Sequence, residues 1–255
     1  MARELRRLLI GRDRLTAVGD GSLPLTAEES RYLERVLRFR PGDRFAVVDG
    51  AGCLWSARLR DDRQAELEQP LAAPLERQTR PRPQLVLAAA VVKRDFEVVV
   101  RMAVELGVDR LIPLVCERIA VQGQLRPDRW RSIAAEAAEQ CERLWQPEIE
   151  APMALADLLA LDQPETLNFW ASARGEERGD LGALLDQISP EPGAAPSVIR
   201  LACGPEGGWS EAEEQQALEQ GWRAVELGPR ILRSSTACVA GLSALSFWRA
   251  RICGC

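Results

Sequence analysis

The strongest constraint on the fold is a strand, helix, strand pattern in the last quarter of the chain. The mostly apolar run at 198–203 predicts a buried strand, and Ser210 with Glu213 forms a capping box that predicts a helix closed by Gly221. Residues 223–227 predict a second strand. A unit of this length is normally a right-handed parallel crossover, so both loops that follow the strands leave the same edge of the sheet. Open α/β sheets bind ligands at that edge.

The two loops have an unusual composition for a nucleotide site. The first is Gly-Pro-Glu-Gly-Gly at 204–208 and the second is Leu-Gly-Pro-Arg-Ile-Leu-Arg at 227–233. Neither matches the three-glycine dinucleotide pattern or ends in the Lys-Ser/Thr of a P-loop. The glycines let main-chain groups approach a ligand closely, while Pro205 and Pro229 stiffen the turns. Such a pocket suits an adenine ring that is bound by main-chain groups.

Alternating strands and helices are predicted from residue 85 onward, as in an α/β domain with a parallel sheet. Strands are expected at 85–92, 110–115 and 166–171. Asp95 is expected to cap a helix that ends at Gly107, and Pro127 to begin a long helix with an apolar side reaching Leu144. The last helix is expected at 235–251, and 183–197 is interpreted as a Pro- and Gly-bearing connection. Small residues in the last helix suit either a dimer interface or a monomer core.

The N-terminal part predicts a small β-barrel. Thr26 and Glu29 form a capping box for a short helix, and the turn at 41–43 leads into strands expected at 44–48, 53–60 and 64–68. The domain prediction is therefore a β-barrel domain at 1–72, a proline-rich linker at 73–84 and an α/β domain at 85–255.

The charge distribution is more informative than the net charge of −5, which argues against a generally basic RNA-coating protein. Residues 1–44 hold ten arginines against seven acidic residues, and five of these arginines fall in the first 14 positions. Such a cluster on a flexible N-terminal stretch could hold an RNA backbone, although a solvated face is an equally good interpretation of the composition. The candidate RNA-binding residues are Arg6, Arg7, Arg12, Arg14 and Arg38.

Cysteine and hydropathy patterns narrow the class of protein further. The seven cysteines are an odd number without Cys-x-x-Cys spacing, and the chain has no histidine, so we predict reduced thiols and no metal site. Cys253 and Cys255 could form a redox or metal tail, but a frayed terminus is the simpler interpretation. The longest apolar run, 85–92, is too short to span a membrane. These features indicate a cytoplasmic enzyme.

The combined motifs resemble the RsmE-type uridine-N3 methyltransferases of small-subunit (16S) ribosomal RNA, which belong to the SPOUT superfamily. The resemblance rests on Gly-Pro-Glu-Gly-Gly-x-Ser, on Leu-Gly-x-Arg-Ile-Leu-Arg, and on the Thr-Ala at 236–237. It extends upstream and covers nearly the whole chain. The upstream matches are Val36-Leu37-Arg38, 41–43, 49–50, Lys93, 105–109, Glu117-Arg118, 129–130 and 136–140 with Arg143.

The resemblance implies a SPOUT-type parallel sheet with a C-terminal trefoil knot, preceded by a small PUA-like β-barrel. It also implies S-adenosyl-L-methionine as cofactor, small-subunit rRNA or the assembled subunit as partner, and a homodimer that completes each site. Carried over by position, the catalytic candidates are Arg233, Arg230, Arg143 and Glu206. The cofactor-binding candidates are Leu201, Gly204, Pro205, Glu206, Gly207, Gly208, Leu227, Gly228, Ile231, Leu232, Ser234 and Thr236.

Methylation at uracil N3 requires the loss of a proton. A site for this chemistry is expected to stabilise the anion that spreads over O2 and O4 with fixed cations, and to supply a base. Arg233 is the first candidate for the cation, and Glu206 is the best remaining base, although Glu206 serving only to anchor the turn is at least as good an interpretation. The target base must leave any stack, which favours a single-stranded RNA region.

The chain departs from the family pattern at one position. The family usually has Arg-Thr-Glu-Thr-Ala where this chain has Arg-Ser-Ser-Thr-Ala at 233–237, so Ser235 replaces a carboxylate. We expect an active enzyme in which that carboxylate is supportive. Two alternatives remain at this stage: a non-catalytic RNA-binding or ribosome-assembly protein of the same fold, and a SPOUT methyltransferase acting on another RNA.

Overall fold

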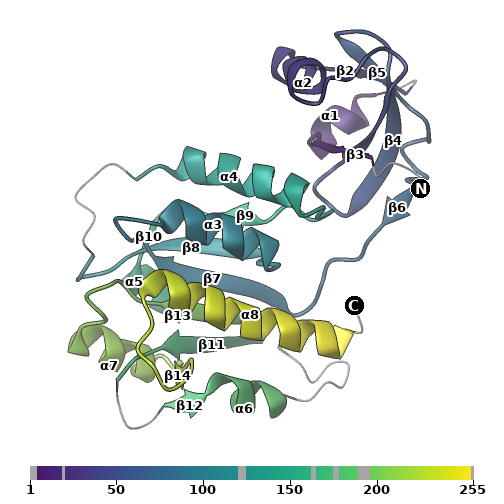
Figure 1. Cartoon of the computed structure of the whole chain (residues 1–255). Coiled ribbons are helices and arrows are strands. Elements are labelled where there is room, and N and C mark those ends of the chain that lie inside the picture. The colour runs from purple at the N-terminus through teal and green to yellow at the C-terminus, as the bar shows by residue number, and fades with distance from the viewer. Residues whose placement is uncertain are drawn as a thin grey trace. The chain divides into compact units, whose positions relative to one another are not determined.

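The computed structural model describes residues 5–18, 21–119, 125–161, 165–174, 178–188 and 196–253. The chain divides into two compact units (Figure 1). The N-terminal unit consists of Met1–Arg80 with Ala138–Gln146, and the C-terminal unit of Pro81–Ala137 with Pro147–Cys255. No pattern in the sequence indicated that the short segment 138–146 belongs with the N-terminal unit.

The N-terminal unit is built on a mixed sheet with the strand order β1-β3-β4-β5-β2, in which β6 also pairs with β4. β1 runs parallel to β3, and the other pairs are antiparallel. The predicted strands at 44–48, 53–60 and 64–68 are confirmed to within one residue at each end. The strands are β1 (Arg7–Leu9), β2 (Ser22–Pro24), β3 (Arg44–Val48), β4 (Cys53–Leu59), β5 (Gln64–Leu67) and β6 (Glu76–Arg77).

The helices of this unit are α1 (Arg12–Thr16), α2 (Ala27–Arg31) and the π-helix η1 (Tyr32–Val36). The capping box of Thr26 and Glu29 is confirmed, because both reciprocal hydrogen bonds are present. The expectation of a flexible N-terminal stretch is wrong for the described residues, since they form β1 and α1. Leu8, Ile10 and Leu15 are buried there and hold the stretch in place.

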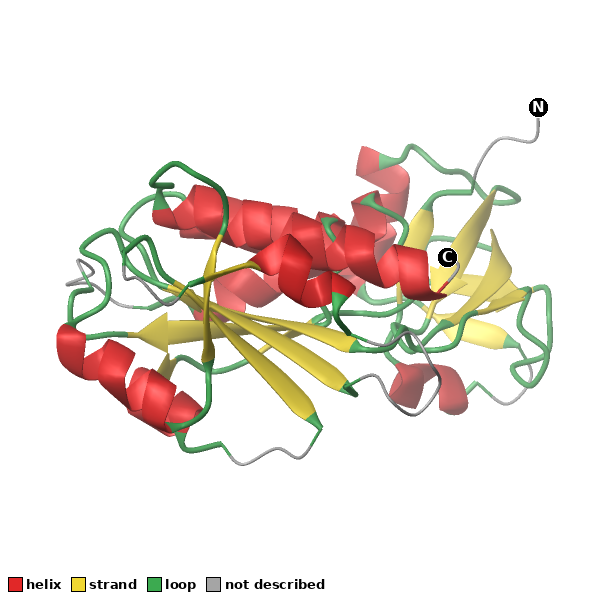
Figure 2. Cartoon of the chain, turned by 90° about the horizontal axis from the view of Figure 1, so that it is seen from below, coloured by secondary structure: helices red, strands yellow, loops and turns green. Residues whose placement is uncertain are grey.

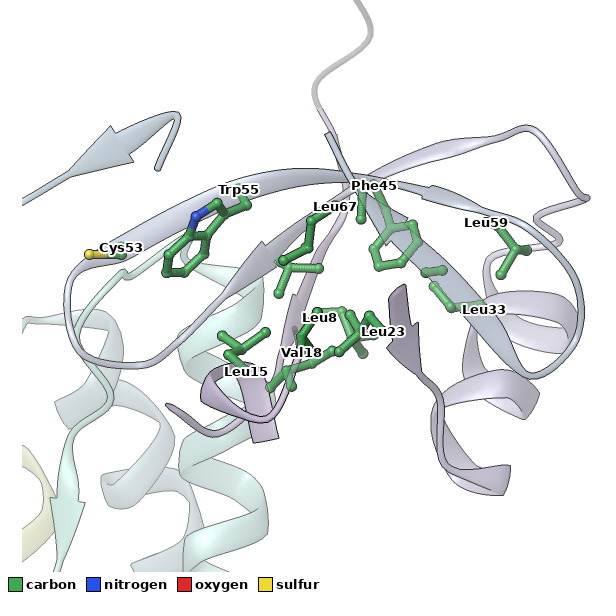
Figure 3. Close-up of a cluster of buried hydrophobic side chains, with 14 residues drawn as sticks. Leu8, Leu15, Val18, Leu23, Leu33, Phe45, Cys53, Trp55, Leu59 and Leu67 are labelled. Carbon is green, nitrogen blue, oxygen red and sulfur yellow. The ribbon is translucent and has the colours of Figure 1, made fainter. Parts of the chain in front are cut away.

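The described residues of this unit form two apolar clusters, and Figure 3 shows the larger one. Phe45, Trp55 and Leu67 contribute from the sheet, and Leu15 and Leu33 from the helices. Part of the segment predicted as a linker, 73–84, is not a free connection, because β6 lies within it and pairs with β4.

The C-terminal unit contains a parallel sheet with the order β10-β8-β7-β13-β11-β14-β12, and β9 also pairs with β8. Its strands fan out with the usual twist (Figure 2). The strands predicted at 110–115, 166–171 and 198–203 have these bounds in the structure. The strands are β7 (Gln84–Ala90), β8 (Arg110–Val115), β9 (Glu148–Ile149), β10 (Met153–Ala154), β11 (Thr166–Ala171), β12 (Gly179–Asp180), β13 (Val198–Cys203) and β14 (Arg223–Glu226).

Helices cover both faces of this sheet. One face packs Val86, Ala88 and Ile112 against the leucines of α5 and Ala217 of α7. α3 packs against α8, which in turn lies along β7 and β13. The helices are α3 (Phe96–Glu105), α4 (Pro127–Gln140), α5 (Leu155–Leu159), α6 (Leu181–Asp186), α7 (Glu211–Glu219) and α8 (Ser234–Cys253).

Three local predictions need correction. The connection expected at 183–197 begins inside α6, whose start is capped by Asp180 through the amide of Ala183 at 2.8 Å. α4 ends at Gln140 and does not reach Leu144, because Glu142 has a positive φ of 62°. Asp95 stands at the N-cap of α3, but its own φ is 69° and its side chain caps no amide.

A buried ion pair fixes the end of α8. The Arg249 guanidinium contacts the Asp109 carboxylate and donates to the carbonyl of Gly107 at 2.7 Å. Asp109 also accepts the amide of Leu85 at 2.9 Å. These bonds join α8 to the start of β7 and to the turn before β8. No helix within the described ranges is both long and apolar enough to cross a membrane.

Candidate active site

The two glycine-containing loops meet at one edge of the C-terminal sheet, as predicted. Ala171 of β11 pairs with Cys203 of β13 on one side and with Val225 of β14 on the other, so the three strands end in register. The first loop, 204–210, follows β13, and the second loop, 227–233, follows β14. The Ser234 hydroxyl donates to the Gly204 carbonyl at 2.5 Å and ties the end of the second loop to the start of the first.

Trp209 supports the first loop from below. Its buried indole stacks on Trp170 with ring centroids 3.8 Å apart and donates to the Ala171 carbonyl at 2.9 Å. A Cβ on Gly204 would lie 2.7 Å from this ring, so only glycine fits there. The amide of Gly208 donates to Pro205 at 2.9 Å and closes a turn with φ of 70° at Gly208. The exposed part of the loop is therefore Glu206, Gly207 and Gly208.

Arg118 supports the same loop, a role that the sequence did not reveal. Its guanidinium donates to the carbonyl of Trp209 at 2.8 Å and lies 3.5 Å from the carbonyl of Gly207. A Cβ on Gly207 would meet Arg118 at 3.1 Å. The only signal in the sequence was the Glu-Arg pair among the family motifs, and spacing alone gave it no contact with the loop.

Glu213 also connects the first loop to the segment that contains Arg118. The capping box of Ser210 and Glu213 is confirmed, and the second oxygen of the buried Glu213 carboxylate accepts the amide of Glu117 at 2.9 Å. One carboxylate therefore fixes both the start of α7 and the turn that follows β8.

The second loop is more exposed than the first. Gly228 has a φ of 108° with open space around its Cα, and residues 228–231 are exposed. Ile231 is 72% exposed, although it is an apolar side chain. Leu227 and Leu232 are partly buried, and α8 begins at Ser234, which is buried. The loop therefore offers main-chain groups, the apolar side chain of Ile231, and the exposed side chains of Arg230 and Arg233.

Close packing of α8 holds both loops from behind. A Cβ on Gly241 would lie 2.3 Å from Leu201 and 3.4 Å from Leu227. The side chain of Leu201, a cofactor-binding candidate, is fully buried against this helix, and its main chain lies inside the sheet between Leu87 of β7 and Phe169 of β11. Thr236, another candidate, is exposed in the first turn of α8.

Three of the four catalytic candidates lie on these loops. Glu206 is exposed on the first loop, and Arg230 and Arg233 are exposed on the second. Their side chains make no hydrogen bond or ion pair with another described residue. Arg143, the fourth, belongs to the N-terminal unit, where its Nε donates to the carbonyl of Trp145 at 3.2 Å.

Buried thiols lie next to the first loop. Cys203 ends β13 and hydrogen-bonds Cys238 of α8, and this bond together with burial raises the pKa of Cys203 well above its ordinary value. Burial likewise raises the pKa of Cys116 to about 12. Both cysteines are therefore neutral thiols at physiological pH. The described part of the chain contains no group of three or more residues suited to holding a metal ion.

The candidate RNA-binding arginines divide into two kinds. Arg7 pairs with Glu142 at 3.1 Å, and Arg14 pairs with Glu29 and donates to the carbonyl of Pro24. The hydrogen bond that Arg14 donates to Glu29 raises the pKa of Arg14. Arg6, Arg12 and Arg38 are exposed, and their side chains form no ion pair with another described residue.

Comparison with known proteins agrees with this arrangement. The RNA methyltransferase domain family matches residues 79–246, and the RNA methyltransferase PUA domain family matches 25–68. The chain is 36% identical to ribosomal RNA small subunit methyltransferase E of Synechocystis sp. over 89% of its own length and 73% of that protein. It is 29% identical to the Bacillus subtilis protein of the same name, with 88% and 89% covered.

A solved structure is similar as well. Ribosomal RNA small subunit methyltransferase E from Neisseria gonorrhoeae, crystallised with S-adenosyl methionine, superposes with a TM-score of 0.79 at 28% identity. The match covers 96% of this chain and 98% of that protein. The predicted fold class, a SPOUT-type parallel sheet preceded by a PUA-like domain, is thereby confirmed, and the chain belongs to the RNA methyltransferase family.

Proposed function

We propose that this protein transfers a methyl group from S-adenosyl-L-methionine to N3 of a uridine in small-subunit (16S) ribosomal RNA. The observation that carries the proposal is the pair of loops tied together by Ser234 and Gly204 at the carboxyl edge of the parallel sheet. The family relationship and the names of the relatives support the reaction and the substrate class.

The residues at this edge fit the cofactor. An adenosyl group needs main-chain donors and acceptors for the adenine edge and apolar contact for its face. The loops offer exposed main chain at 206–208 and 228–231, and the exposed Ile231 supplies apolar surface. The cofactor, when bound, supplies an electrophilic methyl group on a sulfonium. The residues proposed to hold it are Leu201, Gly204, Pro205, Glu206, Gly207, Gly208, Leu227, Gly228, Ile231, Leu232, Ser234 and Thr236.

The chain's own groups prepare the acceptor. The Arg233 guanidinium, which no described side chain engages, donates to the uracil oxygens on which negative charge develops. Arg230 is the second candidate and Arg143 the third. Glu206 is the candidate base that takes the N3 proton. Uracil N3–H is a weaker acid than a carboxylic acid. A carboxylate can therefore take this proton only where the arginines stabilise the uracil anion.

The N-terminal residues 1–72 are proposed as the RNA-binding domain. Replacing Arg6, Arg7 and Arg12 with alanine should weaken RNA binding and flatten its salt dependence, while cofactor affinity stays unchanged. Because Arg7 is held by Glu142, we expect most of this effect to come from Arg6 and Arg12. Equal salt slopes for this variant and the parent would leave the cluster as a solvated face.

Three further features are proposals that rest on family membership. They are a trefoil knot around the two loops, a homodimer that completes each site, and a cytoplasmic location alongside the ribosome. Light scattering of the purified protein tests the dimer directly: a monomeric mass at concentrations that support activity would exclude it.

The decisive experiment is mass spectrometry of small-subunit rRNA from a strain that lacks this gene, before and after complementation. We expect one methylated uridine to disappear and to return with the intact gene. Purified protein should also incorporate labelled methyl groups into small subunits isolated from the deletion strain. Unchanged rRNA in the deletion strain would contradict the assigned substrate.

Ser235 supports a second candidate function, a non-catalytic RNA-binding or ribosome-assembly protein. This residue lies in the first turn of α8, where the relatives' pattern has a carboxylate. Calorimetry and methyl incorporation separate the two functions. Stoichiometric S-adenosylmethionine binding without methyl transfer to any small-subunit preparation would favour the non-catalytic protein, and transfer would exclude it.

A further inference from the structure

The N-terminal unit contains a cavity of about 900 Å³ to which no role has yet been given. Four arginines line it, namely Arg6, Arg38, Arg44 and Arg58. Arg6 directly precedes β1, and Arg38 follows η1. Arg44 and Arg58 lie on the neighbouring strands β3 and β4. The volume lies near the top of the range of about 300–1,000 Å³ that is typical of small-molecule sites.

Two of these arginines are engaged by a carboxylate and two are not. Arg44 and Arg58 share the carboxylate of Glu68, at 2.8 Å and 3.1 Å. Arg6 and Arg38 are exposed and form no side-chain hydrogen bond or ion pair with another described residue. The cavity therefore presents two available guanidinium groups beside two arginines that Glu68 holds in place.

The carboxylates that line the cavity do not cancel this charge. Asp43 accepts the amide of Arg40 at 2.7 Å, and Glu142 pairs with Arg7 at 3.1 Å. The Arg40 amide is neutral and leaves the Asp43 charge in place, but four arginines line the cavity against two carboxylates, so its net charge is positive. An anion with geometry suited to a guanidinium fork, such as a phosphate, matches this surface.

The backbone at Arg38 is constrained. η1 ends with the amide of Leu37 donating to Tyr32 at 3.0 Å, and Arg38 then takes a φ of 58° before the amide of Phe39 donates to Leu33 at 2.9 Å. π-helical turns and left-handed non-glycine residues occur disproportionately at functional sites. Here they turn the chain so that Arg38 lines the cavity.

Apolar groups lie among the arginines. Val36 is 64% exposed, and Leu37 and Phe39, which also line the cavity, are partly buried. A purely anionic partner such as an acidic peptide would leave this apolar surface without contacts. A nucleotide has both a charged phosphate and an apolar base face, and in single-stranded RNA the base is free to leave the stack.

We propose that this cavity binds one unstacked nucleotide of single-stranded RNA, with phosphate groups on Arg6 and Arg38 and the base against Val36 and Phe39. The inference deepens the proposed function, because it rests on RNA being the substrate. It assigns the N-terminal unit a specific preference for unpaired RNA, in addition to a general attraction for phosphate.

Binding of a fluorescent single-stranded RNA of about ten nucleotides to the full-length protein tests the inference. Arg38→Gly removes the guanidinium and tolerates the positive φ, and Arg6→Ala removes the other available charge. Each should weaken binding about tenfold, as expected for a charge-assisted hydrogen bond, and lower the salt slope by about 0.7 per phosphate contact. Val36→Ser should weaken binding severalfold with the salt slope unchanged.

Arg63→Ala is the matched control, because it removes one exposed arginine from the same unit outside the cavity. The inference is overturned if Arg63→Ala weakens binding as much as Arg38→Gly does. It is also overturned if duplex RNA of equal length binds as tightly as the single strand, or if a polyglutamate peptide competes as well as RNA.

Methyl transfer distinguishes this inference from the proposed function. A parent protein that methylates no rRNA, while Arg38→Gly and Arg6→Ala lose single-stranded RNA, would sink the function and leave the nucleotide site standing. If the parent methylates rRNA and both variants bind the oligonucleotide as tightly as the parent, the proposed function stands and the nucleotide site is rejected.

Discussion

The two units offer ligands different parts of the polypeptide. In the C-terminal unit, three glycines at 207, 208 and 228 expose the main chain of the two loops, and Trp209 and Arg118 turn inward as supports. In the N-terminal unit, the basic cavity presents side chains, with the main chain serving as support.

This difference has a consequence for how each site responds to substitution. A main-chain site depends on backbone conformation, so it fails when a glycine acquires a side chain and is otherwise insensitive to residue identity. A side-chain site loses affinity in steps, one guanidinium at a time. Substitution patterns should therefore differ between the units even when the ligands are parts of one reaction.

The largest effect is expected at the glycines of the main-chain site. Gly228→Val forces a β-branched residue to a φ of 108°, and Gly207→Val places side-chain atoms against Arg118. Both should abolish S-adenosylmethionine binding in calorimetry, while RNA binding by the N-terminal unit persists. Gly221→Val is the control, because Gly221 also has a positive φ and open surroundings but lies beyond α7, outside both loops. If Gly221→Val lost S-adenosylmethionine binding equally, the loss would report general backbone strain and would not locate the site on these loops.

The ion pair at the starts of β7 and β8 in the C-terminal unit should be nearly as sensitive to substitution. Arg249→Ala removes the cation that pairs with the buried Asp109 carboxylate, and breaking a buried ion pair typically costs about 3–5 kcal/mol of unfolding free energy. Arg251→Ala removes an exposed pair with Asp186 and should cost about 1 kcal/mol or less. Hydrogen exchange should place the Arg249 effect in the C-terminal unit. Equal destabilisation of the N-terminal unit would show that the two units do not unfold separately.

Arg233 is the exception within the main-chain site, because its side chain is proposed to act. Arg233→Ala should slow methyl transfer roughly 100-fold, the usual cost of losing one donor to a developing anion, with little change in cofactor affinity. Ser235→Glu should preserve or raise the rate if a carboxylate there only orients the arginine. Full activity of Arg233→Ala would remove this residue from the chemistry, and an inactive parent rescued by Ser235→Glu would favour the non-catalytic protein.

The smallest effect is expected at Glu29, the carboxylate that pairs with Arg14 in the N-terminal unit. Burial alone would raise the pKa of Glu29, but hydrogen bonds from Arg14 and from Thr26 outweigh it and hold the pKa below the ordinary value. The stability gained is thus present above the ordinary carboxyl pKa and is lost as the pH falls through the lowered one. Glu29→Gln should cost about 1 kcal/mol at neutral pH, measured by urea unfolding, and the difference from the parent should shrink in acid. A difference that grows in acid would contradict the pairing.

Local patterns predicted much of the fold. The capping boxes at Thr26 and Ser210 and the run at 198–203 gave correct starts for two helices and the correct bounds of β13, because each depends on neighbours within a few residues. The meeting of the two loops at one sheet edge also followed from the length of the crossover between β13 and β14.

Long-range contacts lay beyond the reach of such patterns. Arg118 reaches the first loop across about 90 positions, and Leu144 packs with the N-terminal strands although it follows α4. Spacing carries no information on either contact. The arginines at 7 and 14 looked available in the sequence, and only their partners Glu142 and Glu29 show that they are already engaged.

The position of β13 has a consequence for how the protein is made. This strand lies between β7 and β11, yet it is synthesised after both, and its partner residue Gln84 precedes Val198 by more than 100 positions. Until the ribosome has released this strand, β7 and β11 have no common neighbour, and the sheet that carries the two glycine-containing loops has a gap at its centre. Contacts of such separation slow folding and leave strand edges exposed to other chains. We therefore expect the edges of β7 and β11 to stay open to other chains until residues 198–203 have been synthesised.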